Sequence, residues 1–504
     1  MARAMTYPEK TSALTGATLL ACSQVAVTIA GYLIHFVLAR TLGPVPYGVF
    51  GVSYNVLYVF VLFVTAGIPA AVSHFVGADP RSATATMALA LRLQAAISVF
   101  AAIVYGIGAG LIASTLSDPS LEPYLRASAL AIPAHALLYL YLGYLGALQL
   151  FSRQASVTMV FAIVRLIIVA LLAYFVGVLG AMAGLVLAPL SAMLLGAWLS
   201  PRPAAEPNAS APPIRALAVY ALPLTMLNLA LQLLLTVDLL LVKALLQDDV
   251  TTGYYTAASA IARVPYFVFA GVGLVLLPSV SRSLAQGLND QAAHLIRQAI
   301  RAVIVCVAPA VGMTAAIGKQ MVELLFSADF ASAAKPLPVL VAGVSLIGLF
   351  YVLASVQAAS DQEWCPVFAA LAALGVGLGL GTWLVPACGS IGAALMVLGM
   401  GVMATGPTLV MVMWRFHVVF PIFTLGRSLV ATTAAVFVVA PFPTGAMASV
   451  VALATGIVVY LLALVVLGEL EPGDRALIMR SSVVASWRRL RTPPSEPQDD
   501  LPRS

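Results

Sequence analysis

Long apolar segments follow one another along almost the whole chain, from residue 12 to residue 468, with only short polar breaks between them. An apolar segment of about 20 residues is long enough to cross a bilayer as a helix, so the pattern predicts about fourteen transmembrane helices. We therefore expect an all-α integral membrane protein. The predicted spans are residues 12–38, 49–74, 84–114, 124–149, 155–176, 179–199, 215–245, 255–280, 298–317, 336–358, 365–385, 390–413, 421–440 and 446–468.

The composition supports this interpretation, because 62% of the 504 residues are hydrophobic and only 9% are charged. About 25% of residues are charged in an ordinary soluble domain. The first apolar segment is too long for a cleavable signal peptide, so we expect it to remain as the first helix. The four cysteines form no metal-like CxxC pattern, and we expect neither a metal site nor a cofactor.

Basic residues indicate the orientation of the chain in the membrane. Lys and Arg are more frequent in the even-numbered breaks between spans than in the odd-numbered ones, and both ends of the chain are basic. The positive-inside rule then places both termini in the cytoplasm, which requires an even number of spans. The net charge of +6 fits cytoplasmic loops and a tail close to anionic headgroups, so we expect membrane lipids and no nucleic acid as partners.

Two segments, LARTLGPVPYGVFGVSYNV from Leu38 and LVKALLQDDVTTGYYTAASAI from Leu241, are similar to each other. Each contains a basic residue followed by an aromatic residue beside a glycine, which fits a tight re-entry into the membrane. The similarity predicts an internal repeat, although interfacial turns can also converge on these residue types independently. The candidate gate or interface residues are Arg40, Tyr47, Lys243 and Tyr254.

The repeat predicts how the chain is divided. We expect a six-helix lobe in residues 1–199 and a second six-helix lobe in residues 215–413, with two additional transmembrane helices in residues 414–468. Residues 200–214, rich in Pro and Ala, are expected to be a cytoplasmic linker. Residues 469–504 are expected to be a cytoplasmic tail. Transporters often bind their cargo between such repeats.

Four charged residues lie well inside predicted spans: Arg92, Arg165, Asp238 and Arg263. A charge at the middle of a bilayer costs about 2.5 to 3.5 kcal/mol, so such side chains usually face a bundle interior or a water-filled cavity. The excess of positive charge predicts a cationic cavity for an anionic cargo. These four residues are our candidates for the lining of that cavity.

Each candidate also has a structural interpretation. Arg165 has no acidic residue in its span and suits phosphate oxygens, but it could instead bond to groups of neighbouring helices. Arg92 lies in the cytoplasmic third of its span, where its side chain can extend to the interface. Asp238 and Arg263 lie at similar depth in consecutive spans and could form an ion pair, or Asp238 could be a cation or proton site.

The segment ARTLGPVPYGVFGVSYNV from Ala39, the Gly67-Ile68-Pro69 turn, and ARVPYFVFAGVGLVLLPSVSR from Ala262 together resemble the polysaccharide-export flippase family. This family is part of the multidrug, oligosaccharidyl-lipid and polysaccharide exporter superfamily. The resemblance implies a V-shaped pair of helical lobes whose central cavity opens alternately to cytoplasm and periplasm. It also implies that the cargo is an isoprenoid-pyrophosphate-linked oligosaccharide, and that other polysaccharide-assembly proteins are candidate partners.

Within this interpretation the deep arginines would hold the diphosphate while the glycan crosses through the wet cavity. Polar side chains inside the spans are candidates for the sugar path, because hydroxyls, amides and aromatic rings suit a glycan. They also bond across helices in many membrane proteins. These residues are Gln24, Asn55, His135, Tyr139, Tyr141, Tyr144, Gln149, Asn228, Gln232 and Gln357.

The sequence favours a flippase of the cytoplasmic (inner) membrane over two alternatives. A cation-coupled multidrug exporter of the same superfamily typically uses an embedded acid in its first lobe, and residues 11–78 contain none. Asp238 keeps cation coupling open. A polytopic glycosyltransferase or polymerase would need carboxylates in an external loop, and the predicted external loops are short. We therefore expect a transporter and not an enzyme.

Overall fold

The structure is a computed structural model that describes residues 13–201, 210–360, 362–443 and 445–469. The described residues form helices and no strands. The first part contains α1 (Ala13–Leu42), α2 (Pro44–Thr65), α3 (Ile68–Ala78), α4 (Ala83–Thr115), α5 (Glu122–Ser128), α6 (Ala131–Ala147) and α7 (Phe151–Leu199). The second part contains α8 (Ile214–Leu234), α9 (Val237–Leu246), α10 (Asp249–Ala262), α11 (Val264–Ala285), α12 (Asn289–Leu325), α13 (Leu337–Ala358), α14 (Trp364–Phe416), α15 (Ile422–Val439) and α16 (Ala446–Val466). Three short 3-10 helices, η1 (Pro80–Ser82), η2 (Pro119–Leu121) and η3 (Ala328–Ala334), lie in the connections.

The described residues contain twelve helical segments that are long and apolar enough to cross a membrane. Two of them, α7 with 49 residues and α14 with 53 residues, would be about 75 and 80 Å long as straight helices, more than twice the roughly 30 Å of a bilayer core. Each of these two is bent back on itself and therefore supplies two spans. The described residues thus form fourteen spans, and the predicted all-α membrane fold is confirmed.

Glycine makes both sharp reversals. Gly177 has φ 65° and ψ −144°, and Gly389 has φ 59° and ψ −137°, a conformation that other residues rarely adopt. The two arms of α7 then pack closely, because a Cβ added at Gly184 would lie 2.8 Å from the Cα of Val169. A glycine therefore makes the turn between the fifth and sixth spans and also the turn between the eleventh and twelfth, as expected for two lobes of similar structure.

We expect Gly177→Ala and Gly389→Ala each to lower the stability of the folded protein by about 1 to 3 kcal/mol, because a side chain is strained in this backbone region. Thermal unfolding of the purified protein in detergent would measure the loss. Gly108→Ala is a matched control, since Gly108 is helical and no atom lies within 4 Å of an added Cβ. Equal melting temperatures for Gly177→Ala and the control would contradict this explanation.

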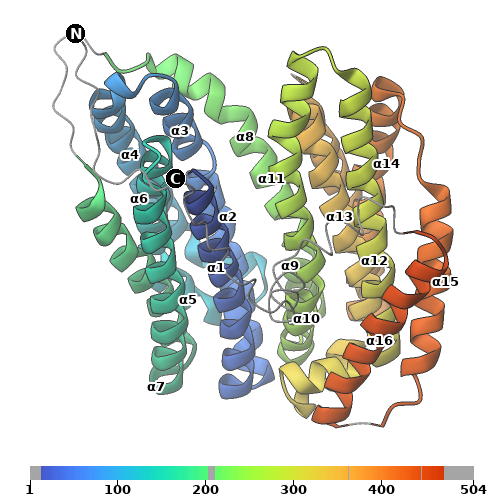
Figure 1. Ribbon diagram of the computed structural model, residues 1–504. Helices are drawn as coiled ribbons and strands as arrows, with labels where there is room; N and C mark the ends of the chain where they lie inside the picture. The colour runs from blue at the N-terminus through green and yellow to red at the C-terminus, as the bar shows by residue number, and fades with distance from the viewer. Residues whose placement is uncertain (1–12, 202–209, 361, 444, 470–504) are drawn as a thin grey trace, which may run out of the picture.

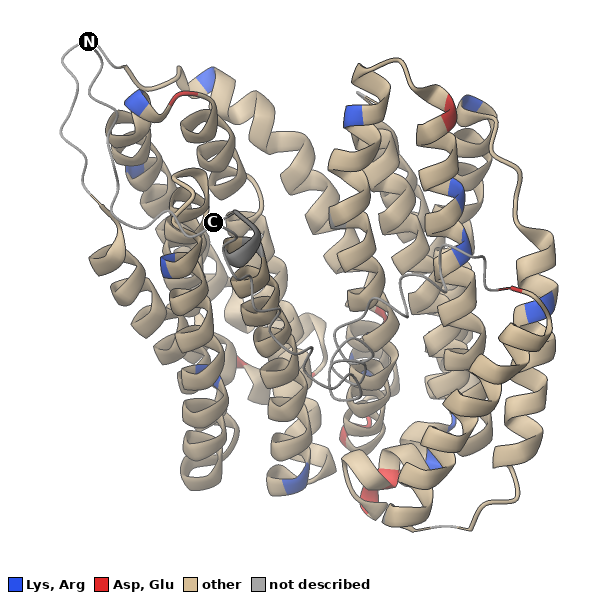
Figure 2. Cartoon of the chain, viewed as in Figure 1, with Lys and Arg blue, Asp and Glu red and all other residues tan. Residues whose placement is uncertain are grey.

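Two groups of helices stand side by side in Figure 1. One group contains α1 to α7, the other contains α10 to α16, and α8 runs obliquely between them. Figure 2 shows long stretches of helix without any charged residue, as expected for surfaces that face lipid. The fold class is therefore two helical lobes with α15 and α16 added beside α12.

The exact lobe boundaries stay a prediction. Residues 202–209 of the expected linker and residues 470–504 of the expected tail lie outside the described residues. What the structure does show is where α7 ends, at Leu199, and where α8 begins, at Ile214, on either side of the predicted linker.

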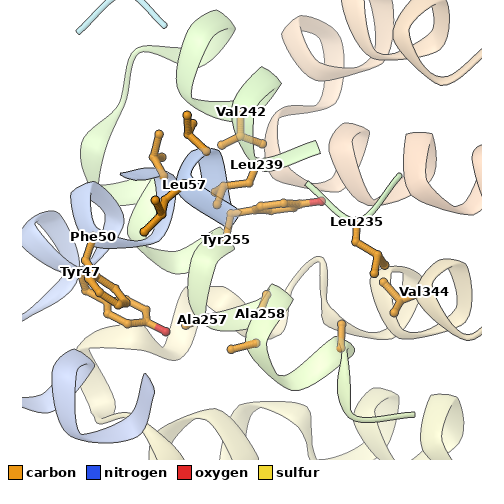
Figure 3. Close-up of a cluster of buried hydrophobic side chains, with 14 of the residues drawn as sticks. Tyr47, Phe50, Leu57, Leu235, Leu239, Val242, Tyr255, Ala257, Ala258 and Val344 are labelled. Carbon is orange, nitrogen blue, oxygen red and sulfur yellow. The ribbon is translucent and has the colours of Figure 1, made fainter. Parts of the chain in front are cut away.

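The largest group of buried apolar side chains spans both lobes. Figure 3 shows part of it, with Tyr47 and Phe50 of α2 side by side and Leu239 of α9 next to Tyr255 of α10. Each of these four side chains is fully buried. A large part of this shared core therefore lies around the junction of α2, α9 and α10, where the first lobe meets the start of the second.

Candidate functional site

A cavity of about 250 Å³ lies between the lobes and is lined by α1, α2, α6, α7, α9, α10 and α11. Arg165 lies fourteen residues after the start of α7 and twelve before its reversal at Gly177, so the cavity is near the middle of this span. The lining is mainly aromatic and polar. Its principal side chains are Gln24, Tyr32, His35, Tyr54, Asn55, Tyr58, Tyr139, Arg165, Ser259 and Arg263.

Arg165 is the cavity's most strongly buried cation, with 7% of its surface exposed. A guanidinium has five N–H donors. Its Nη2 donates to the Tyr54 hydroxyl at 2.9 Å, while its buried Nε has no acceptor among the described residues. An unsatisfied buried donor costs about 1 to 3 kcal/mol. The hydrogen bonds of the described residues therefore satisfy Arg165 only in part.

Aromatic rings surround this guanidinium. Its central carbon lies 5.9 Å from the ring centroids of both Tyr54 and Tyr58, and 5.8 Å from that of Phe161. Tyr54 and Tyr58 are one turn apart on α2, with their ring centroids separated by 4.3 Å. Cation–π attraction of about 0.5 to 2 kcal/mol per contact compensates part of the cost of burying the charge. The site thus holds a cation without an acidic partner.

Arg263 is the second cation of the cavity, and it comes from the other lobe. It lies at the junction between α10 and α11, where one helix ends and the next begins. Its Nη2 donates to Asn55 Oδ1 at 2.9 Å and to the carbonyl of Leu235. That carbonyl is available because α8 ends at Leu234 and α9 begins at Val237. Its Nε and Nη1 have no hydrogen-bond partner among the described residues.

The charge of the cavity is positive. No Asp or Glu is among its lining residues, all of which belong to the described chain. His35 also faces it, with Nδ1 hydrogen-bonded to the Tyr47 hydroxyl at 2.9 Å and its ring edge-on to Tyr54 at 5.6 Å. The structure therefore brings together two arginines from opposite lobes in a small polar and aromatic chamber.

Asp238 does not line this cavity, although its neighbour Leu239 does. Only 4% of Asp238 is exposed, its Oδ2 accepts from the Tyr255 hydroxyl at 2.8 Å, and its Oδ1 has no partner among the described residues. The predicted ion pair with Arg263 is wrong. The break before α9 turns the carboxylate toward α10, while Arg263 bonds to Asn55 instead.

Arg92 does not line the cavity either, so its predicted place there is also wrong. It is exposed on α4. Gln94, two positions along, is buried and donates to the Val64 carbonyl at 2.6 Å. Two residues of an α-helix differ by about 200° around its axis, so the face that packs inward is opposite Arg92. This position agrees with the alternative interpretation of a side chain that extends to the membrane interface.

The end of the bundle opposite the start of α1 is closed by contacts that we call the far-end seal. Arg40 of α1 donates from Nε to the Phe326 carbonyl at 2.7 Å and also bonds to the Leu324 carbonyl at the end of α12. Lys243 of α9 pairs with Asp118 of the first lobe at 2.6 Å and with Asp249. Each basic residue of the predicted repeat therefore connects the two lobes.

The aromatic residues of the repeat take part in the same seal. The Tyr47 ring lies 6.0 Å from Phe326 and 5.7 Å from Phe330, measured between centroids. The Tyr254 ring lies 6.2 Å from Phe330. Tyr47 belongs to the first lobe and Tyr254 to the second, so one phenylalanine contacts an aromatic residue from each.

Two glycines allow α2 and α10 to touch at this seal. A Cβ added at Gly48 would lie 2.8 Å from the backbone nitrogen of Gly253, and one added at Gly253 would lie 2.0 Å from the Pro44 carbonyl oxygen. No real Cβ tolerates such distances. The two segments that resemble each other in sequence therefore pack directly against each other, and they need glycine at the crossing.

The ion pair of Asp118 provides a prediction for the seal. Partial burial raises the pKa of this carboxyl, but hydrogen bonds from Lys243 and Ser120 outweigh that effect and hold the pKa below its usual value. A depressed pKa means that the stabilisation is complete at neutral pH and is lost as the pH falls below about 4. We expect Asp118→Asn to lower the melting temperature at pH 7 and to abolish the part of the acid sensitivity that Asp118 causes.

Thermal unfolding of wild type and Asp118→Asn between pH 3 and pH 8 would test this prediction. The difference is expected to be about 1 to 2 kcal/mol at pH 7, because Asp249 still pairs with Lys243. Asp290→Asn is a suitable control, since Asp290 is an exposed acid at the start of α12. A difference between wild type and Asp118→Asn that does not shrink at low pH would contradict the role of the ion pair.

Several cavity residues were not predicted as such: His35, Tyr32, Tyr54, Tyr58 and Phe161. A signal for some of them exists in the sequence. Tyr47, Phe50, Tyr54 and Tyr58 recur at helical spacing along α2, which predicts one aromatic face. Among the predicted sugar-path residues, Gln24, Asn55 and Tyr139 line the cavity. The other seven are not among its lining residues.

Comparison with known proteins gives a consistent picture. Residues 13–284 match the model of a family described as polysaccharide biosynthesis protein. No curated protein matches the chain. Among solved structures, the lipid II flippase MurJ in an inward closed conformation is similar with a TM-score of 0.72 and 15% identity, over 88% of this chain and 98% of that one.

Two further solved structures are multidrug resistance MATE family transporters of the MOP superfamily. The inward-facing one has a TM-score of 0.68 and 13% identity over 78% of this chain and 94% of its own. The outward-facing one has a TM-score of 0.55 and 12% identity over 80% and 95%. At such identities the similarity establishes the fold.

Proposed function

Because the chain belongs to the polysaccharide biosynthesis protein family, we propose that it is a flippase for an isoprenoid-pyrophosphate-linked oligosaccharide or polysaccharide precursor. It moves this lipid across the cytoplasmic membrane by alternating access. The family and the fold already establish a multi-pass membrane protein built like known transporters. The cargo and the direction of transport are the proposed part.

The observation that supports this cargo most directly is the pair of arginines at the central cavity. Arg165 comes from the first lobe and Arg263 from the second, and no acidic side chain lines the cavity between them. Arginine stays charged and can bind phosphate oxygens through two parallel N–H groups. In the proposed complex, each phosphate of the diphosphate bonds to one of the two arginines. The glycan would then meet the tyrosine and amide side chains of the cavity.

The positions of the basic loops indicate which side of the membrane each end of the bundle faces. With both termini in the cytoplasm, the far-end seal lies on the outer face of the membrane. In the present state this seal is closed by Arg40 and Lys243. Opening it while the lobes close at the cytoplasmic end would expose the bound diphosphate to the outside. No covalent bond is made or broken in this cycle, so the protein acts as a transporter without a cofactor.

A second candidate is a cation-coupled multidrug exporter, which the MATE-like fold permits. The specific observation in its favour is Asp238, a buried carboxylate with one unsatisfied oxygen. The cationic lining of the cavity argues against a cationic drug, because like charges repel in a poorly screened site. Asp238 is equally compatible with a flippase that is coupled to a cation.

Reconstitution into vesicles tests the proposal. A fluorescent isoprenoid-diphosphate saccharide would be placed in one leaflet, and its appearance in the other would be followed with an impermeant quencher. We expect transfer of this probe, no transfer of a matched isoprenoid saccharide that lacks the diphosphate, and no efflux of a cationic dye. Transport of the dye without transport of the diphosphate lipid would refute the flippase and support the exporter.

A further inference from the structure

A second cavity lies on the outside of the bundle, between α2–α3, α4 and α8. We call it the lateral groove. Its volume is about 380 Å³, within the usual range for small-molecule sites. Its walls include Phe63, Ile97 and Leu222, which are 41%, 40% and 50% exposed. None of its lining residues lines the central cavity, so the groove is a separate site on the membrane-facing surface.

The groove has the length of one lipid leaflet. On α8 its lining extends from Ile214 to Met226, which is about 18 Å at 1.5 Å per residue, or somewhat more than half of the hydrocarbon core of a bilayer. Its walls offer little to a polar ligand. The hydroxyl of Thr225, for example, is used in a 2.8 Å hydrogen bond to the Ala221 carbonyl. A hydrocarbon chain fits such a surface.

One end of the groove is positively charged. Arg215 lies in the first turn of α8, lines the groove and is exposed. It has no hydrogen bond or ion pair to any of the residues that the structure describes. Arg92, also exposed, directly precedes the groove residue Leu93 on α4. An apolar channel of one-leaflet length with an exposed arginine at its end matches the charge and shape of an anionic phospholipid.

We propose that the lateral groove binds an anionic phospholipid of the cytoplasmic leaflet, with its phosphate at Arg215 and an acyl chain along α8. Basic pockets between transmembrane helices on the cytoplasmic side are known to bind such headgroups. The site lies where α8, the first helix after the linker, crosses the first lobe. At this crossing an added Cβ on Gly67 would lie 2.3 Å from Thr225 Oγ1. The lipid would therefore be in contact with both lobes.

Native mass spectrometry of the full chain in detergent tests the charge selection, because bound lipids are counted directly. Phosphatidylglycerol and phosphatidylcholine with identical acyl chains would be added in turn. We expect phosphatidylglycerol to bind about fivefold more tightly, as expected for one arginine near an anionic headgroup. Arg215→Gln should remove this preference, while Arg297→Gln, which changes an exposed arginine on α12, should keep it.

A second pair of variants tests the position of the acyl chain. Ala218→Trp fills the groove and should abolish the binding of both lipids at this site, whereas Ile107→Trp alters an exposed position elsewhere on α4 and should not. If Ala218→Trp does not yield folded protein, Leu222→Trp on the same wall replaces it. Equal binding of both lipids to wild type, or unchanged binding to the groove-filled variant, would overturn the proposal. Neither measurement depends on transport, so failure of the flippase assay leaves this result intact.

Discussion

Arg165→Gln is expected to lower the affinity for a diphosphate-linked lipid by about 100-fold and to reduce its translocation in proportion. A charge-assisted pair of hydrogen bonds to phosphate contributes about 3 kcal/mol, and each 1.4 kcal/mol is a factor of ten. Glutamine keeps polar N–H groups but loses the charge. The folded protein should not become less stable, since Arg165 has an unsatisfied Nε and no acidic partner in the cavity.

Binding of the fluorescent diphosphate lipid and its rate of transfer in vesicles would be measured at equal protein density. Arg165→Lys keeps the charge without the planar fork and should lose less. Arg92→Gln is the matched control, because it removes an arginine from the same lobe that does not line the cavity. Full activity of Arg165→Gln, or an equal loss in Arg92→Gln, would show that the cavity is not the phosphate site.

Gly253→Ala is expected to shift the protein toward the state in which the far-end seal is open and to slow transport. The added methyl would lie 2.0 Å from the Pro44 carbonyl oxygen, so α2 and α10 must separate. Such overpacking costs about 1 to 3 kcal/mol, and it affects only the state in which these helices touch. The population should therefore move toward the state that is open on the far side by about tenfold.

Thiol labelling measures this shift. The four native cysteines would be replaced, a cysteine would be introduced at the cavity residue Ser259, and an impermeant maleimide would be added from outside. Gly253→Ala should label about tenfold faster than its parent. Gly108→Ala, where an added methyl meets nothing within 4 Å, should label at the parental rate. An unchanged rate for Gly253→Ala would mean that the contact between α2 and α10 does not control access.

Much of the fold could be predicted from the sequence, because the length of each apolar segment is a direct physical requirement of the bilayer. The predicted break between residues 176 and 179 falls at Gly177, where α7 reverses, and that between 385 and 390 falls at Gly389 in α14. The sequence similarity between the segments around Arg40 and Lys243 also has a counterpart in the structure, because each of these residues bonds to a residue of the other lobe.

The site was less predictable, because it depends on how helices are rotated and broken. Depth in a span could be read for Arg92 and Arg165, but the direction of each side chain could not. Of these two arginines, only Arg165 lines the cavity. The Asp238–Arg263 ion pair was expected from similar depth in consecutive spans, but beside the helix breaks at Leu235 and Arg263 the carboxylate accepts from Tyr255 and the guanidinium donates to Asn55. Hydrophobic patterns do not reveal such breaks.

The shared apolar core at the junction of α2, α9 and α10 stabilises the state in which the far-end seal is closed. Side chains such as Tyr47, Phe50 and Tyr255 are fully buried there. Separating the lobes would expose them to water, at a free-energy cost of roughly 1.5 to 3 kcal/mol for each large residue. For the flippase that we propose, the state with the closed far-end seal is therefore the more stable one when no cargo is bound. In the proposed transport cycle, opening the seal would then require free energy from cargo binding or from an ion gradient.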